Sequence, residues 1–226
     1  MSMTIMLNFL KDLEQNNNRE WFQAHKGQYQ EAKDAFAKLV QDLLLSLREK
    51  DKALPLVEPQ ELTFKLMRDT RFSHDKSPYN PAFRAHIGPQ GKLPIPVGYY
   101  IMIRPNDRSF LGGGLFADMF KDATTMVREQ IATDGDNWQR IISEPSFQKN
   151  FTVRGTSLKN VPKGYDASHP QGEFLKNKSW YLEYPVSDQE LLKADFIPNA
   201  VAIFLQMRPF NQFLNNALRD FQMPAR

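Results

Sequence analysis

Cysteine is absent from the 226 residues of this chain. Its absence excludes disulfide bonds, thiol nucleophiles, zinc sites with Cys ligands and iron–sulfur clusters. The four histidines show no His-Glu-x-x-His or similar spacing, so we expect no metal site. The one set that folding could still bring together around a metal is His74, Asp75 and His169. A Gly-x-Ser-x-Gly nucleophile motif is also missing, which argues against a serine hydrolase.

Long apolar runs and a strong net charge are missing as well. The longest apolar run covers residues 200–205, whereas a membrane-spanning helix needs about 20 apolar residues. The first residues carry no basic stretch before an apolar core, so we expect a soluble, cytoplasmic protein that is not exported. The 29 Lys and Arg exceed the 26 Asp and Glu by only three charges, an excess too small to indicate nucleic-acid binding by itself.

The order of the predicted elements indicates an α+β fold. At roughly 150 residues per domain, the length favours one domain over residues 1–226. We expect helices over about 1–50, a sheet over about 60–117 and further helices over about 118–226. This order predicts a mostly antiparallel sheet of about four to five strands, with helices packed on it.

Five segments have the composition of strands, because aromatic and β-branched residues dominate them and turn-forming residues bound them. They are 62–67, 83–87, 97–104, 109–116 and 180–186. The residues between the third and fourth segments, 105–108, read as a hairpin turn. Short connections without helices favour antiparallel pairing.

Helices are predicted from apolar spacing and from capping residues. Apolar side chains recur every three or four residues from Tyr29 to Leu47, which indicates one buried face of a long helix. Asn18 is a suitable N-cap before this region, and Asp118 could cap a helix over about 118–132. Ser187 and Glu190 have the spacing of a capping box.

The densest polar cluster lies at residues 68–80, between two predicted strands. Its arginines offer planar forks for phosphate or carboxylate, its lysine adds a point charge, its carboxylates could orient these cations, and its tyrosine could donate to a ligand oxygen. The same charges could instead pair with one another and lock the loop. The candidate ligand-binding residues of this segment are Arg68, Asp69, Arg71, Asp75, Lys76 and Tyr79.

The segment 152–179 is predicted to be a long basic loop. Such loops are often functional, so Lys163 and His169 could close over the anion pocket, with the imidazole as a proton carrier. An ordinary solvated basic surface explains the composition equally well.

Glycines and aromatic residues among the strands have two interpretations each. The run Gly112–Gly114 could cradle a phosphate before a helix, or it could allow close packing where a side chain would clash. The aromatic residues could stack on single-stranded nucleic acid or form ordinary core and cross-strand pairs. They are Phe83, Tyr99, Tyr100, Phe110 and Phe116. No RNA-binding signature is present, so we do not expect nucleic acid as a partner.

Residues 68–79, Arg-Asp-Thr-Arg-Phe-Ser-His-Asp-Lys-Ser-Pro-Tyr, resemble the RDxRFSxDK[ST]PY signature of the domain of unknown function 2461 family. The resemblance extends along almost the whole chain and includes 17–22, 98–100, 110–115, 162–165 and 169–170. Asn80 departs from the Lys that many relatives carry there. The resemblance implies a bacterial-type cytoplasmic protein. It implies no reaction, and therefore no catalytic residue and no cofactor.

From the polar cluster we expect the protein to bind an anionic small molecule that bears phosphate or carboxylate. Whether it is also an enzyme stays open, as does its oligomeric state. The alternatives are a nucleic-acid or protein-binding module, and a structural protein in which the Arg and Asp network only locks the fold.

Overall fold

Four strands form an antiparallel sheet in which each strand lies beside the next one in the sequence. They are β1 (Phe83–Ile87), β2 (Tyr99–Ile103), β3 (Ser109–Leu115) and β4 (Trp180–Val186). The structure is a computed structural model that describes residues 2–224. The turn from β2 to β3 places Asn106 and Asp107 at φ 66° and 57°, the backbone of a tight hairpin. The predicted hairpin is therefore confirmed.

Ten helices accompany the sheet within the described residues. They are α1 (Ser2–Gln15), α2 (Arg19–Ala24), α3 (Lys26–Lys50), α4 (Pro59–Leu62), α5 (Lys121–Thr133), α6 (Gly135–Ile142), α7 (Pro145–Asn150), α8 (Gly172–Leu175), α9 (Asp188–Leu191) and α10 (Phe196–Ala217). The side chain of Asn18 caps α2 by accepting from the backbone of Trp21 at 2.9 Å. The Ser187 and Glu190 capping box begins α9. Both capping predictions are confirmed.

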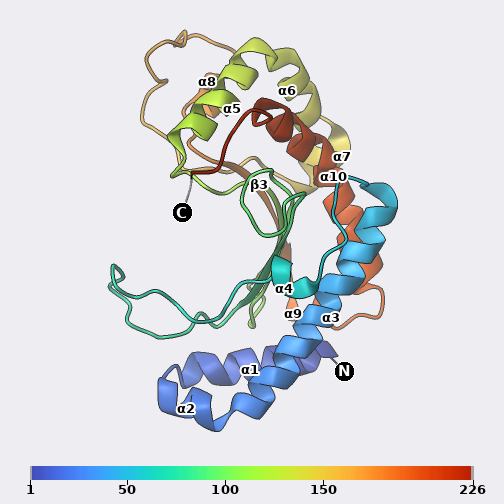
Figure 1. The fold of residues 1–226 in the computed structure, drawn as a ribbon. Helices are drawn as coiled ribbons and strands as arrows, with labels where there is room; N and C mark the ends of the chain where they lie inside the picture. The colour runs from blue at the N-terminus through green and yellow to red at the C-terminus, as the bar shows by residue number, and fades with distance from the viewer. Residues whose placement is uncertain (1, 225–226) are drawn as a thin grey trace.

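One face of the sheet packs against α3 and α10, which lie to its right in Figure 1. The ring of Phe36 on α3 stacks on Phe83 with centroids 5.2 Å apart, and Phe204 on α10 lies 5.3 Å from Tyr99. Alternation along the strands sends every second side chain into this core and leaves the others on the opposite face. We call that opposite face, which neither helix covers, the open face.

Glycine at position 113 allows α10 to lie directly on β3. A Cβ atom there would stand 3.0 Å from the amide oxygen of Asn211 and 3.1 Å from the sulfur of Met207. The packing interpretation of the glycine run is therefore correct at this position.

The α+β class is confirmed, and the sheet has four strands in the described residues. The strand predicted at 62–67 is wrong: Pro59 begins a helical turn that ends at Leu62, and beyond it only Thr63 and Met67 make isolated bridges. The helix predicted from Asp118 starts later, with Phe120 as its N-cap. The segment 152–179 is not all loop, because it contains α8 and two isolated bridges. None of the helices in residues 2–224 combines the length and apolar character that crossing a membrane requires.

Candidate functional site

The two arginines singled out in the sequence both form ion pairs. Nη2 of Arg71 lies 2.6 Å from Oδ2 of Asp69, and both side chains are mostly exposed. Hydrogen bonds from Arg71 hold the pKa of the Asp69 carboxyl below its usual range. Nη1 of Arg68 pairs with Asp75, and the Arg68 side chain is only 27% exposed. Asp69 and Asp75 therefore already bind guanidinium groups that the sequence analysis assigned to an anionic ligand.

The rest of segment 68–79 is tied together internally. The Asp75 carboxylate accepts from the hydroxyl and the backbone of Ser77, and these bonds, with the Arg68 pair, lower the pKa of Asp75. The ammonium group of Lys76 donates to the carbonyl of Thr70 at 3.0 Å. The loop thus has a defined shape that does not depend on a ligand.

Three of the eight predicted residues share a cavity. Arg68, Lys76 and Tyr79 line a space of about 370 Å³, whose further lining residues are Asn17, Asn18, Arg19, Met67, Thr70 and Pro78. We call this space the cation cavity. Asp69, Arg71 and Asp75 are not among its lining residues.

Lys163 and His169 lie elsewhere. Nε2 of His169 is 3.2 Å from the carbonyl of Ala132 on α5, whereas Asn17, between α1 and α2, holds the backbone of Tyr79. Figure 1 places α5 and the α1–α2 pair at opposite ends of the molecule. The structure therefore does not bring these two residues to the Arg68 segment. Within residues 2–224, no three His, Asp or Glu side chains are placed to hold a metal ion.

A larger cavity, of about 680 Å³, lies on the open face of the sheet. Its walls carry a row of aromatic rings in contact. Tyr100 lies 5.7 Å from Phe110 and 5.4 Å from Phe116, and Phe116 stacks on Tyr181 at 4.5 Å. Phe64 extends this row at 6.4 Å from Tyr100. Such a row offers flat apolar surface to a ring-shaped ligand.

The charges around this open-face cavity are mainly positive. Arg84 and Lys92 line it, and neither forms a salt bridge with any described residue. Nη2 of Arg84 donates to the carbonyl of Lys65 at 3.2 Å, and its buried Nε has no partner. The carboxylate of Glu183 also lines the cavity but pairs with Arg154 at 2.9 Å. Two cations are therefore left without a balancing carboxylate.

His86 brings a buried imidazole to the same cavity. The side chain is 6% exposed, and its Nδ1 is buried without a hydrogen-bond partner. Burial lowers its pKa to about 4, although the carbonyls of Gly91 and Leu93 partly oppose the shift. The ring is therefore neutral near pH 7 and can accept or donate one hydrogen bond to a bound molecule.

Glycine at position 112 leaves room for the rings of Phe110 and Phe116, which line this cavity. A Cβ atom there would stand 3.1 Å from the ring of Phe116 and 3.3 Å from that of Phe110. The sequence did contain a signal for this site, since Arg84 and His86 alternate with buried residues along β1. The alternation along β1 did not show that α3 and α10 both pack on the other face of the sheet and leave the open face uncovered by either.

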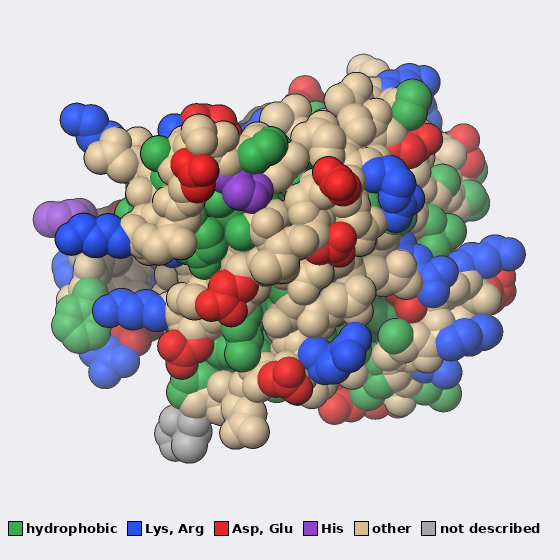
Figure 2. Space-filling view, turned by 90° about the horizontal axis from the view of Figure 1, so that it is seen from above, with side chains coloured by type: hydrophobic (Ala, Val, Ile, Leu, Met, Phe, Trp, Pro, Cys, Tyr) green, Lys and Arg blue, Asp and Glu red, His purple; other side chains and the backbone are tan. Residues whose placement is uncertain are grey.

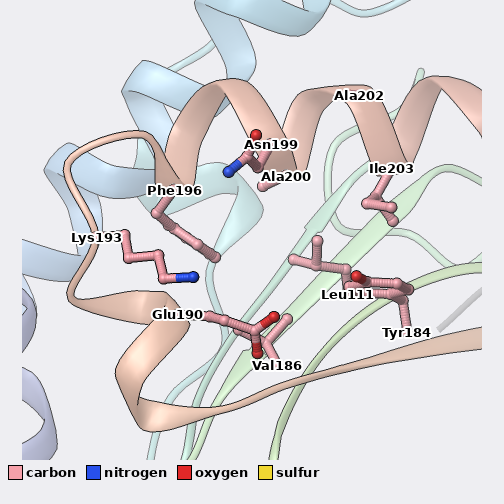
Figure 3. Close-up of a pocket in the computed structure, with 10 residues that line it drawn as sticks. All are labelled: Leu111, Tyr184, Val186, Glu190, Lys193, Phe196, Asn199, Ala200, Ala202 and Ile203. Atoms are coloured by element: carbon pink, nitrogen blue, oxygen red, sulfur yellow. The ribbon is translucent and has the colours of Figure 1, made fainter.

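Figure 3 shows a smaller cavity of about 250 Å³ between α10 and the edge of β3 and β4. Its carboxylate, Glu190, already accepts from the hydroxyl and backbone of Ser187. Lys193 points into the space, but the walls are otherwise largely apolar, with Phe196 and Ile203 facing Leu111. This cavity therefore has fewer charged and aromatic side chains for a ligand to contact than the open-face cavity has.

Figure 2 looks from the end that carries α5 and α6, and several Lys and Arg side chains project at its left edge. The 68–79 segment extends toward the same side in Figure 1. The molecule is an α+β protein with a four-stranded antiparallel sheet, one face of which packs against α3 and α10. The chain belongs to the conserved hypothetical protein family DUF2461, whose family model matches residues 5–213. No curated protein and no solved structure is significantly similar to it.

Proposed function

We propose that the protein binds an anionic small molecule with a planar apolar part, and that the open-face cavity is the binding site. The observation that carries the proposal is that unpaired cations and stacked aromatic rings line one cavity of suitable volume. A volume of about 680 Å³ falls within the range of roughly 300–1,000 Å³ typical of small-molecule sites. No residue of segment 68–79 lines this cavity, so the proposal does not depend on that segment.

Arg84 is the main anion-binding group in this proposal. Its guanidinium lies over the ring of Phe64, with Cζ 5.6 Å from the centroid, which fixes the direction of the fork. Because its Nε is buried without a partner, a ligand oxygen that accepted from this atom would satisfy a donor that is otherwise costly to bury. Lys92 adds a second, exposed cation at the rim.

The planar part of the ligand is assigned to the aromatic row. Tyr100 lies near the centre of this row, with Phe64, Phe110 and Phe116 all within 6.4 Å of it. His86 supplies a neutral hydrogen-bonding group to whichever polar atom the ligand presents there.

A fluorescent probe can test this proposal without knowledge of the natural ligand. The anionic dye 8-anilinonaphthalene-1-sulfonate combines a sulfonate with fused rings, and N-phenyl-1-naphthylamine is a neutral analogue. Arg84→Met keeps the aliphatic stem but removes the charge-assisted bond, which is worth about 1.5–3 kcal/mol. We therefore expect the variant to bind the anionic dye at least about tenfold more weakly, and the neutral dye equally well.

Arg140→Met is the matched control, because Arg140 is exposed on α6 and lies outside the cavity. It should bind both dyes as the unchanged protein does. Tyr100→Leu should weaken both dyes, since it removes the ring that both would stack on. Equal affinity of the Arg84→Met and Arg140→Met variants for the anionic dye would refute the proposal.

A further inference from the structure

The cation cavity is a second concave site, separate from the open face. It lies between the turn that joins α1 to α2 and the segment 67–79, and it shares no lining residue with the open-face cavity. Three of its lining residues are cations, Arg19, Arg68 and Lys76, and none is a carboxylate.

Two of these three cations have no carboxylate partner. Arg19, in the first turn of α2, makes no salt bridge to any residue in 2–224. The only hydrogen bond of the Lys76 ammonium group within this range goes to the carbonyl of Thr70. Arg68 does pair with Asp75, but that carboxylate is not among the lining residues and also accepts two bonds from Ser77. The loop thus places Arg68 and Lys76 at the cavity, and its two carboxylates, Asp69 and Asp75, are not among the lining residues.

The walls of the cation cavity are already fixed without a ligand. The Asn17 side chain donates to the carbonyl of Tyr79 at 2.9 Å and accepts from its backbone N–H at 3.1 Å. The ring of Tyr79 stacks on Phe22 with centroids 4.0 Å apart. The backbone of Arg68 donates to the carbonyl of Pro78 at 2.9 Å. Binding would therefore order few groups, which favours affinity.

We propose that the cation cavity binds the phosphate group of a phosphorylated small molecule. Arg19 offers a planar fork that matches phosphate oxygens, and Lys76 adds a point charge. Both Nη atoms of Arg68 already donate to Asp75 or Ser73, so Arg68 contributes mainly positive charge at the wall. A space of about 370 Å³ holds a phosphate group with room for a second one. This site is distinct from the open face, so the proposal gives the protein two anion sites of different character: one flanked by a row of aromatic rings, and one in which three cations stand among Met67, Pro78 and Tyr79.

Calorimetric titration of the full chain with inorganic pyrophosphate tests the proposal. Arg19→Gln and Lys76→Gln each remove one cation from the cavity, and Arg19 and Lys76 are exposed, so the fold should persist. We expect each variant to bind pyrophosphate at least about fivefold more weakly than the unchanged protein. Lys26→Gln, an exposed lysine at the start of α3 outside the cavity, is the matched control and should change the affinity less than about twofold.

Backbone amide signals of Asn18 and Thr70 should shift during the titration, because both residues line the cavity. The proposal is overturned if the unchanged protein shows no saturable binding, or if Lys26→Gln weakens binding as much as Lys76→Gln does. Arg84→Met should leave pyrophosphate affinity unchanged, and Lys76→Gln should leave binding of the anionic dye unchanged. The two proposals can therefore fail independently.

Discussion

Acidification should destabilise the fold through His86, whose imidazole is buried at the open-face cavity. Burial lowers its pKa from the ordinary 6.5 to about 4 in the folded protein. The imidazole regains its ordinary pKa when the chain unfolds, so between these values the unfolded state binds more protons than the folded state. Stability that is fully present above pH 6.5 is therefore lost as the pH falls toward 4.

The magnitude follows from the two pKa values. Their difference corresponds to about 3 kcal/mol of unfolding free energy in full, of which about 2 kcal/mol is lost by about pH 5. For a urea dependence near 2 kcal/mol per molar, the midpoint of unfolding should fall by about 1 M between about pH 7.5 and pH 5. The side chain is only 6% exposed, so solvent screening reduces this figure little.

Urea unfolding followed by circular dichroism at a series of pH values measures the effect. His86→Gln removes the titrating group, so the variant should lose about 2 kcal/mol less than the unchanged protein over the same pH range. His74→Gln is the matched control, because His74 is exposed on the 68–79 segment, and it should keep the full pH dependence. If His86→Gln and the unchanged protein lose the same unfolding free energy on acidification, the claim that the buried His86 imidazole is neutral in the folded protein is refuted.

Three further substitutions test the packing and the caps by thermal or urea unfolding. Gly113→Ala should cost about 1–3 kcal/mol, because its Cβ would press on the amide of Asn211. Gly27→Ala should instead add up to about 1 kcal/mol, since it lies in a helix with nothing within 4 Å of the new atom. Equal effects at the two glycines would contradict the packing of α10 on β3. Ser187→Ala should cost about 1 kcal/mol by breaking its capping box with Glu190, and an unchanged midpoint would contradict it.

The strands were predictable where local sequence and burial agree. Segments 83–87 and 180–186 have the same bounds in the structure as in the prediction, because turn formers flank each of them. Segment 62–67 has a similar composition but failed. Its first residue, Leu62, belongs to the helical turn that begins at Pro59, and strand pairing beyond it is confined to isolated bridges at Thr63 and Met67. Strand pairing depends on a neighbour at the right distance, which composition does not specify.

The candidate site was only partly predictable for a similar reason. The sequence identified the charges of segment 68–79 but not which of them face a cavity, since that depends on how the loop folds against α2. Arg19 was missed as a candidate, although it belongs to the 17–22 stretch that resembles the family. The aromatic residues divided between two faces: Phe83 and Tyr99 lie in the core, whereas Tyr100 lines the open face. The alternation of side chains along a strand accounts for this division, but it does not specify which face of the sheet α3 and α10 cover.

The central claim is that the open face of the sheet is the ligand site, and intermolecular nuclear Overhauser effects from the bound anionic dye test it most directly. The account predicts contacts from the dye rings to Tyr100, Phe116 and Met119, which line that cavity. Contacts confined to Phe196 and Ile203, in the cavity beside α10, would contradict it.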